Sequence, residues 1–147
     1  MRFNDFDKRE MASCIAFHFL GTPYVWGGDD PSGFDCSGFC VEILKSVGAL
    51  PKEGDWNAAM LAKQFPALPI PREGCLVFYS AGQDQRISHV EYCLSPALAI
   101  GASGGGSKTV SPADAWRQNA YIKVRPIKRG RHIAGYADPF SELEVPV

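Results

Sequence analysis

The sequence has no long hydrophobic run and no excess of charge of one sign. None of its apolar stretches approaches the roughly 20 residues that a membrane-spanning helix needs. Its 15 Lys and Arg residues are matched by 16 Asp and Glu residues, for a formal net charge of −1. No basic field is therefore available to hold nucleic acid or an anionic membrane surface. We expect a protein that binds neither nucleic acid nor a membrane.

Cysteine is scarce and shows no metal-binding or disulfide pattern. The five cysteines are an odd number and include no CxxC pair, so we expect neither a metal nor another cofactor. Four of them fall on apolar faces of predicted elements and are expected to be small buried hydrophobic residues: Cys14, Cys40, Cys75 and Cys93.

The N-terminal eight residues also lack the basic start and apolar stretch of a signal peptide. We therefore expect a protein that is cytoplasmic as synthesised, or one that is exported by another route. A chain of 147 residues with 46% hydrophobic residues suits a single domain over 1–147 with a real core.

The order of hydrophobic patterns predicts an α+β fold. A first helix is expected from residue 4 or 5 to Gly21, with Met11, Cys14, Ile15, His18 and Phe19 as its apolar stripe. Further helices are expected after Asp35, after Asp55 and from Ser111. Strands are expected at 75–79, 87–94, 97–102, 121–127 and 132–136. Helices come first and strands later, which is typical of α+β proteins rather than of parallel α/β sheets.

Cys36 has the surroundings of a reactive cysteine. Asp35 is expected to cap the second helix, because its carboxylate can accept a hydrogen bond from a free amide of the first turn. Cys36 then lies in that first turn, where unpaired N–H groups and the helix dipole stabilise a thiolate. The thiolate is the nucleophilic form of cysteine.

A cysteine nucleophile needs a base, and the chain has three histidines. His89 lies in a predicted strand whose alternation sends Ile87, His89 and Glu91 to one face. Such a strand, packed against the Cys36 helix, could present the imidazole to the thiol. We expect His18 to pack on its helix and His132 to lie at the surface.

Three blocks of sequence resemble the NlpC/P60 family of papain-like cysteine peptidases. They are Pro-Tyr-Val-Trp-Gly-Gly at 23–28, Phe-Asp-Cys-Ser-Gly-Phe at 34–39 and Ser-His-Val at 88–90, and the stretch at 73–78 is a weaker fourth match. The resemblance implies a papain-like fold with N-terminal helices packed on a central antiparallel sheet of about five or six strands. It also implies an endopeptidase that acts on stem peptides of bacterial peptidoglycan, next to D-glutamate or a diamino acid.

The resemblance implies a role for each matching residue. Cys36 would be the nucleophile and His89 the base. Tyr24 would place its hydroxyl near the oxyanion or the substrate. Asp35, Ser37 and Ser88 would line the pocket for a free amino end of the stem peptide. Each of these four has a plainer reading as a helix cap, a packed aromatic ring or a local hydrogen-bonding group.

The chain departs from the family where a third polar residue usually orients the histidine. That position falls at or near Gly101, which has no side chain. Glu91 on the strand of His89 is one substitute, and Ser103 or a backbone carbonyl is another.

Other functions remain open from the sequence. The same nucleophile serves a cysteine amidase or acyltransferase, and the glycine at 101 is consistent with a degenerate, non-catalytic structural or binding module. Segments 120–126 and 135–140 resemble phage or prophage versions of the family. Such a protein would have a phage tail or another partner chain, and would act at the cell wall through a phage particle or lysis.

Overall fold

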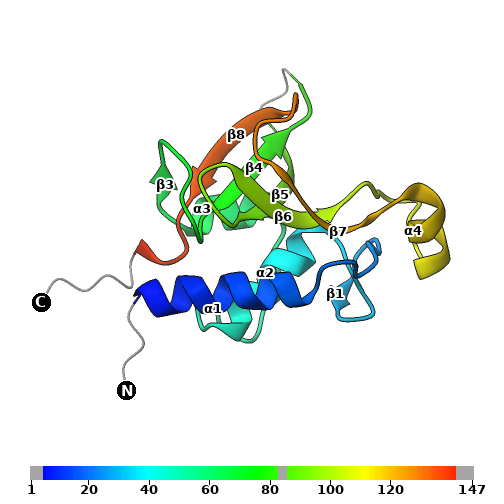
Figure 1. Cartoon of the computed structure of the whole chain (residues 1–147), viewed down its shortest axis with the longest axis horizontal. Coiled ribbons are helices and arrows are strands. Elements are labelled where there is room, and N and C mark those ends of the chain that lie inside the picture. The colour runs from blue at the N-terminus through cyan, green and yellow to red at the C-terminus, as the bar shows by residue number, and fades with distance from the viewer. Residues whose placement is uncertain (1–4, 83–85, 142–147) are drawn as a thin grey trace, which may run out of the picture.

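A computed structural model describes residues 5–82 and 86–141. A layer of helices lies against one face of a twisted sheet, with α1 running along the base of the molecule in Figure 1. The helices are α1 (Asp5–His18), α2 (Cys36–Ser46), α3 (Ala58–Gln64) and α4 (Pro112–Gln118). The strands are β1 (Asp29–Asp30), β2 (Gly33–Phe34), β3 (Ala67–Leu68), β4 (Leu76–Ser80), β5 (Ile87–Cys93), β6 (Leu98–Ser103), β7 (Tyr121–Pro126) and β8 (His132–Ala137).

The main sheet has six antiparallel strands in the order β3-β8-β4-β5-β6-β7. β4 to β7 follow the chain, whereas β8 returns to pair between β3 and β4. The expected α+β fold, with helices packed on an antiparallel sheet of five or six strands, is confirmed.

The core lies between α2 and the centre of the sheet. Phe39, Cys40, Ile43 and Leu44 of α2 are fully buried against β5 and β6. Burying a large apolar side chain contributes about 1.5–3 kcal/mol. This contact therefore fixes the start of α2 relative to β5, the two elements that carry Cys36 and His89.

The predicted apolar stripe of the first helix is wrong at Met11, Cys14 and His18, whereas Ile15 and Phe19 are partly buried against the core. Met11 and Phe17 are 41% and 50% exposed, and Cys14 and His18 are also exposed. The fully buried positions of α1 carry small residues instead. Ala12 and Ala16 are 0% exposed.

The start of α3 differs from the sequence prediction, and two short strand elements were not predicted. Asn57, and not Asp55, caps α3, where its side chain accepts from the N–H of Met60 at 2.9 Å. The proline-rich stretch at 66–71 contains the two-residue strand β3, and the glycine-rich loop at 21–34 contains the hairpin β1-β2.

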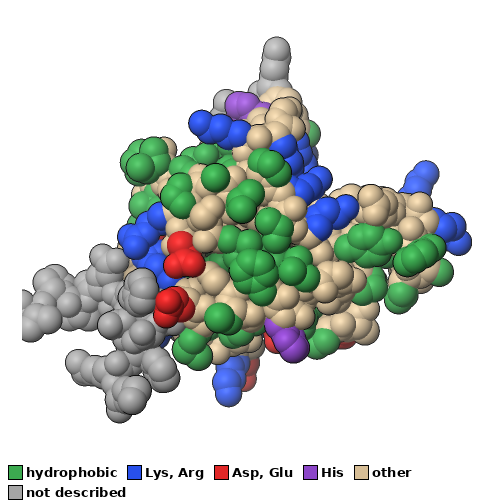
Figure 2. Space-filling model, viewed as in Figure 1, with side chains coloured by type: hydrophobic (Ala, Val, Ile, Leu, Met, Phe, Trp, Pro, Cys, Tyr) green, Lys and Arg blue, Asp and Glu red, His purple; other side chains and the backbone are tan. Residues whose placement is uncertain are grey.

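Several large hydrophobic side chains face solvent. Among them are Trp26, Val110 and Trp116, which are 55%, 65% and 76% exposed. In Figure 2, hydrophobic side chains cluster over the middle of this face and on the arm that carries α4. Within residues 5–82 and 86–141, no helix has the length and apolar character to span a bilayer.

Candidate active site

Asp35 caps α2 as the sequence predicts. Its Oδ1 accepts from the N–H of Gly38 at 2.7 Å and from the Ser37 hydroxyl at 3.3 Å. The backbone of Asp35 has extended angles and its N–H donates to the Gly28 carbonyl at 3.0 Å. The cap thus joins the glycine-rich loop to the first turn of the helix.

Cys36 is the first residue of α2 and is partly exposed. Burial raises the pKa of its thiol above the ordinary 9.0, Asp35 adds to the increase, and the backbone amides of Val90 and Ser37 oppose it. This direction is opposite to the one that the helix start alone predicts. The resting thiol is therefore protonated at neutral pH, and nucleophilic attack by Cys36 requires a base.

His89 and Cys36 line the same cleft of about 290 Å³. The His89 side chain is only 9% exposed. Burial lowers the pKa of His89 below 6.5, and Arg131 and Arg129 act in the same direction, while Glu91 partly offsets them. A neutral imidazole at pH 7 can accept the proton of the thiol.

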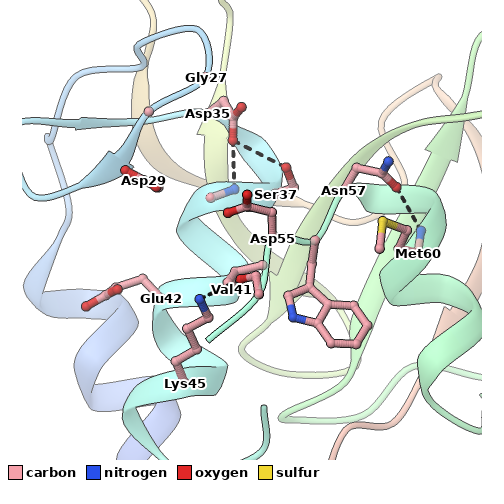
Figure 3. A pocket seen from close by; sticks show the side chains of 14 residues that line it. Gly27, Asp29, Asp35, Ser37, Val41, Glu42, Lys45, Asp55, Asn57 and Met60 are labelled. Atoms are coloured by element: carbon pink, nitrogen blue, oxygen red, sulfur yellow. Dashed lines mark hydrogen bonds between the residues drawn. The ribbon is translucent and has the colours of Figure 1, made fainter. Parts of the chain in front are cut away.

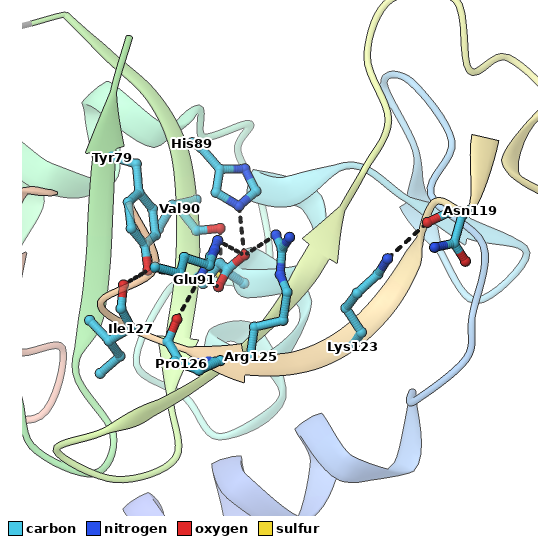
Figure 4. Close-up of polar contacts among 11 residues, drawn as sticks. Tyr79, His89, Val90, Glu91, Asn119, Lys123, Arg125, Pro126 and Ile127 are labelled. Carbon is cyan, nitrogen blue, oxygen red and sulfur yellow. Dashed lines mark hydrogen bonds and ion pairs between the residues drawn. The ribbon is translucent and has the colours of Figure 1, made fainter. Parts of the chain in front are cut away.

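The buried side of His89 carries a charged cluster, shown in Figure 4. His89 Nε2 lies 2.8 Å from Glu91 Oε2, and both side chains are buried. The guanidinium of Arg129 pairs with the two carboxylate oxygens of Glu91 at 3.1 and 2.9 Å. The guanidinium of Arg125 lies 3.5 Å from Glu91 Oε2. Burial alone would raise the pKa of Glu91, but His89 and Arg129 outweigh it and hold that pKa below its usual value.

Ser103 lines the Cys36–His89 cleft without bonding to His89. Its hydroxyl is buried and has no hydrogen-bond partner among the described residues. Of the two side chains that the sequence offers for orienting the imidazole, only Glu91 contacts it.

Tyr24 and Ser88 line the same cleft as the cysteine and the histidine. Tyr24 is buried, and its ring packs so closely on Gly105 that a Cβ there would lie 2.3 Å from ring atom Cδ1. Burial, followed by the nearby Cys36 and Asp35, raises the pKa of the Tyr24 hydroxyl well above 10. Tyr24 thus remains a hydrogen-bond donor at any working pH.

Asp35 and Ser37 line a second, larger cleft of about 490 Å³ on the other side of the helix start. Its rim carries four carboxylates (Asp29, Asp35, Glu42 and Asp55), which Figure 3 shows around α2. Lys45 also lines it and donates to the Gly54 carbonyl at 2.8 Å. The structure therefore separates Asp35 and Ser37 from Ser88, which the sequence placed in one pocket. This acidic cleft attracts a positively charged group.

The sequence analysis missed several residues of both clefts. Arg125 and Arg129 contact Glu91 from 34 and 38 positions along the chain, and Arg131 lines the cleft of His89. No local sequence pattern predicts contacts between residues so far apart. Trp26, to which the sequence analysis assigned no role, lines the Cys36 cleft. Glu42 and Asp55 have no motif around them.

A cysteine at the start of a helix, opposite a histidine on a sheet strand, defines the papain-like class of fold and site. The sequence profile described as the NlpC/P60 family matches residues 21–126. The chain belongs to the NlpC/P60 family.

Individual relatives agree with this assignment. The chain is 39% identical over 109 residues to a probable peptidoglycan endopeptidase, LytE, of Bacillus subtilis, a match that covers 72% of this chain and 30% of LytE. It is 31% identical over 124 residues to a gamma-D-glutamyl-L-lysine dipeptidyl-peptidase of Bacillus cereus, covering 81% of this chain and 32% of that protein. This chain therefore spans about a third of the length of these two curated relatives.

A solved structure shares the fold over nearly its whole length. The crystal structure of the NlpC/p60 domain of the peptidoglycan hydrolase SagA superposes with a TM-score of 0.64 at 25% identity. The match covers 88% of this chain and 97% of the SagA domain.

Proposed function

We propose that this chain is a cysteine peptidase that hydrolyses an amide bond in the stem peptides of bacterial peptidoglycan. The observation that carries the proposal is the cleft that Cys36, at a helix start, shares with the buried, neutral His89. Relatives named as a peptidoglycan endopeptidase and a gamma-D-glutamyl-L-lysine dipeptidyl-peptidase support the substrate class.

The chemistry follows from the two side chains. His89 takes the thiol proton as the sulfur of Cys36 attacks the amide carbonyl. First-turn amides of α2, which have no acceptor within the helix, stabilise the resulting oxyanion together with the Tyr24 hydroxyl. The imidazolium then gives its proton to the leaving amine, and a water activated by His89 releases the acyl group from sulfur.

The acidic cleft supports a substrate with a free amino end. A peptide whose carbonyl carbon lies at Cys36 extends past Asp35 and Ser37 into the carboxylates around α2. A protonated amine there gains charge-assisted hydrogen bonds. With the amino end in the acidic cleft, the bond cut at Cys36 is the one between D-glutamate and the diamino acid.

We also propose that the protein is made in the cytoplasm and meets the cell wall through a phage particle or lysis, with a phage tail or another chain as partner. The resemblance of segments 120–126 and 135–140 to phage versions of the family supports this route. Fractionation of producing cells, with detection of the protein in particles, tests it.

Mass spectrometry of purified muropeptides tests the activity. We expect wild-type protein to release fragments that name the scissile bond, and Cys36→Ala to release none. A folded wild-type protein that leaves every muropeptide intact would direct attention to an amidase or acyltransferase reaction or to a binding module. The same fragments from Cys36→Ala would contradict the proposed nucleophile.

A further inference from the structure

Gly101 of β6 lies directly against Glu91 of β5. A Cβ built at position 101 would be 2.4 Å from Glu91 Cγ and 2.9 Å from Glu91 Cδ. Real Cβ atoms do not approach side chains this closely, so any residue larger than glycine at 101 must displace Glu91. The glycine at 101 therefore leaves the space that the Glu91 side chain fills.

The carboxylate of Glu91 determines which nitrogen of His89 carries the proton. An ionised carboxylate only accepts hydrogen bonds, so His89 Nε2 must donate across the 2.8 Å contact. In the neutral imidazole this leaves the lone pair on Nδ1. Because Nε2 is occupied on the buried side, Nδ1 is the nitrogen left to accept a proton from the Cys36 side of the cleft.

Arg129 holds Glu91 in place. Its two terminal nitrogens contact both carboxylate oxygens, at 3.1 and 2.9 Å, a bidentate arrangement that fixes the plane of the carboxylate. Arg129 also donates to the Tyr79 hydroxyl and the Pro126 carbonyl, each at 3.0 Å. The guanidinium is thus anchored at four acceptors on three elements, and Glu91, at 1% exposure, is rigidly held.

We infer that Glu91, clamped by Arg129 and admitted by the glycine at 101, is the residue that positions the His89 imidazole for its reaction with Cys36. A contribution of Glu91 to catalysis rests on the proposed function. Ser103, the other side chain at hand, makes no hydrogen bond. The chain thus carries the histidine and its positioning group two residues apart on one strand.

NMR of the histidine side chains tests the inference without any substrate. The three histidines can be told apart by comparison with His89→Ala. We expect wild-type His89 to carry its proton on Nε2. In Glu91→Gln the tautomers should mix, because an amide can donate as well as accept, and the pKa of His89 should fall by about one unit, because a favourable negative charge is lost.

Other charged or titratable groups lie around the His89–Glu91 pair and must be counted in that titration. They are Arg125, Arg129 and Arg131 from β7 and the loop after it, Tyr79 from β4, and Cys36 from α2. Glu91→Gln leaves all five in place, and Glu10→Gln, an exposed change on α1, is the matched control. Glu10→Gln should leave both the tautomer and the pKa of His89 unchanged.

Gly101→Ala is a second variant that keeps every charge. Its methyl group must push Glu91 aside, so we expect the same mixing of His89 tautomers even if Glu91→Gln fails to fold. With muropeptides, kcat should fall about a hundredfold in either variant. An unchanged His89 tautomer and pKa in a folded Glu91→Gln or Gly101→Ala protein would overturn the inference. A wild-type protein that does not hydrolyse muropeptides would instead count against the proposed function, whatever the NMR result.

Discussion

Gly38, in the first turn of α2, lies directly against the carbonyl oxygen of Gly28. A Cβ built at position 38 would be 2.1 Å from that oxygen, which also accepts the N–H of Asp35 at 3.0 Å. The glycine-rich loop is therefore packed onto the helix start at backbone distance, and this contact holds Cys36 at the edge of its cleft.

Gly38→Ala should destabilise the protein by about 1–3 kcal/mol, because the extra methyl overpacks a contact between two backbones. Urea unfolding measures the change. Gly106→Ala is the control for stability, since a Cβ at 106 would meet no atom within 4 Å. Equal unfolding midpoints for the two variants would contradict the close packing of the loop on α2.

Asp35 has two separable tasks, capping α2 and facing the acidic cleft. Asp35→Asn keeps a capping oxygen, so stability should change little, whereas Asp35→Ala should cost about 1 kcal/mol. Both variants should raise KM for peptides with a free amino end, because the negative charge is lost. Amino-acetylated peptides, which lack the positive charge, should show no such increase, and an equal increase for both peptides would exclude amine binding.

The acidic limb of the pH profile should lie below pH 6.5. His89 must be unprotonated to take the thiol proton, so kcat/KM should rise as the pH increases through the lowered pKa of His89. Because burial raises the pKa of Cys36, the thiolate absorbance near neutral pH should not differ between wild type and Cys36→Ala. A difference that titrates well below pH 9 would instead show a preformed thiolate and imidazolium.

The ion pair between Arg9 and Asp138 should contribute to stability and not to chemistry. Its two contacts, 2.9 and 2.7 Å, join α1 to the residue after β8, and both side chains are almost fully buried. Asp138→Asn should destabilise the protein by about 3–5 kcal/mol, because the two-point, charge-assisted contact between Arg9 and Asp138 is lost from a buried site. At temperatures where Asp138→Asn is fully folded, its kcat should equal the wild-type value. A lower kcat of the folded variant would link this ion pair to the active site.

Local signals predicted much of the site and failed where partners are distant. The cap of α2 could be predicted because Asp35 and Gly38 are only three positions apart. The alternation along β5 likewise predicted that His89 and Glu91 share one face. The clamp on Glu91 could not be predicted, because Arg129 approaches from 38 positions along the chain. The buried face of α1 was missed in part, since its fully buried positions carry the small residues Ala12 and Ala16. A single catalytic domain over 1–147 stays a prediction.

A ribosome makes β8 after all the other strands, yet β8 belongs in the interior of the sheet, between β3 and β4. Until it emerges, β4 has an unpaired edge and Arg129, just before β8, has not joined Glu91. Nascent chains therefore contain Cys36 and His89 before the contact between Arg129 and Glu91 forms. Under the proposed function, a product truncated before Arg129 contains Cys36 and His89 but lacks the side chain that fixes Glu91.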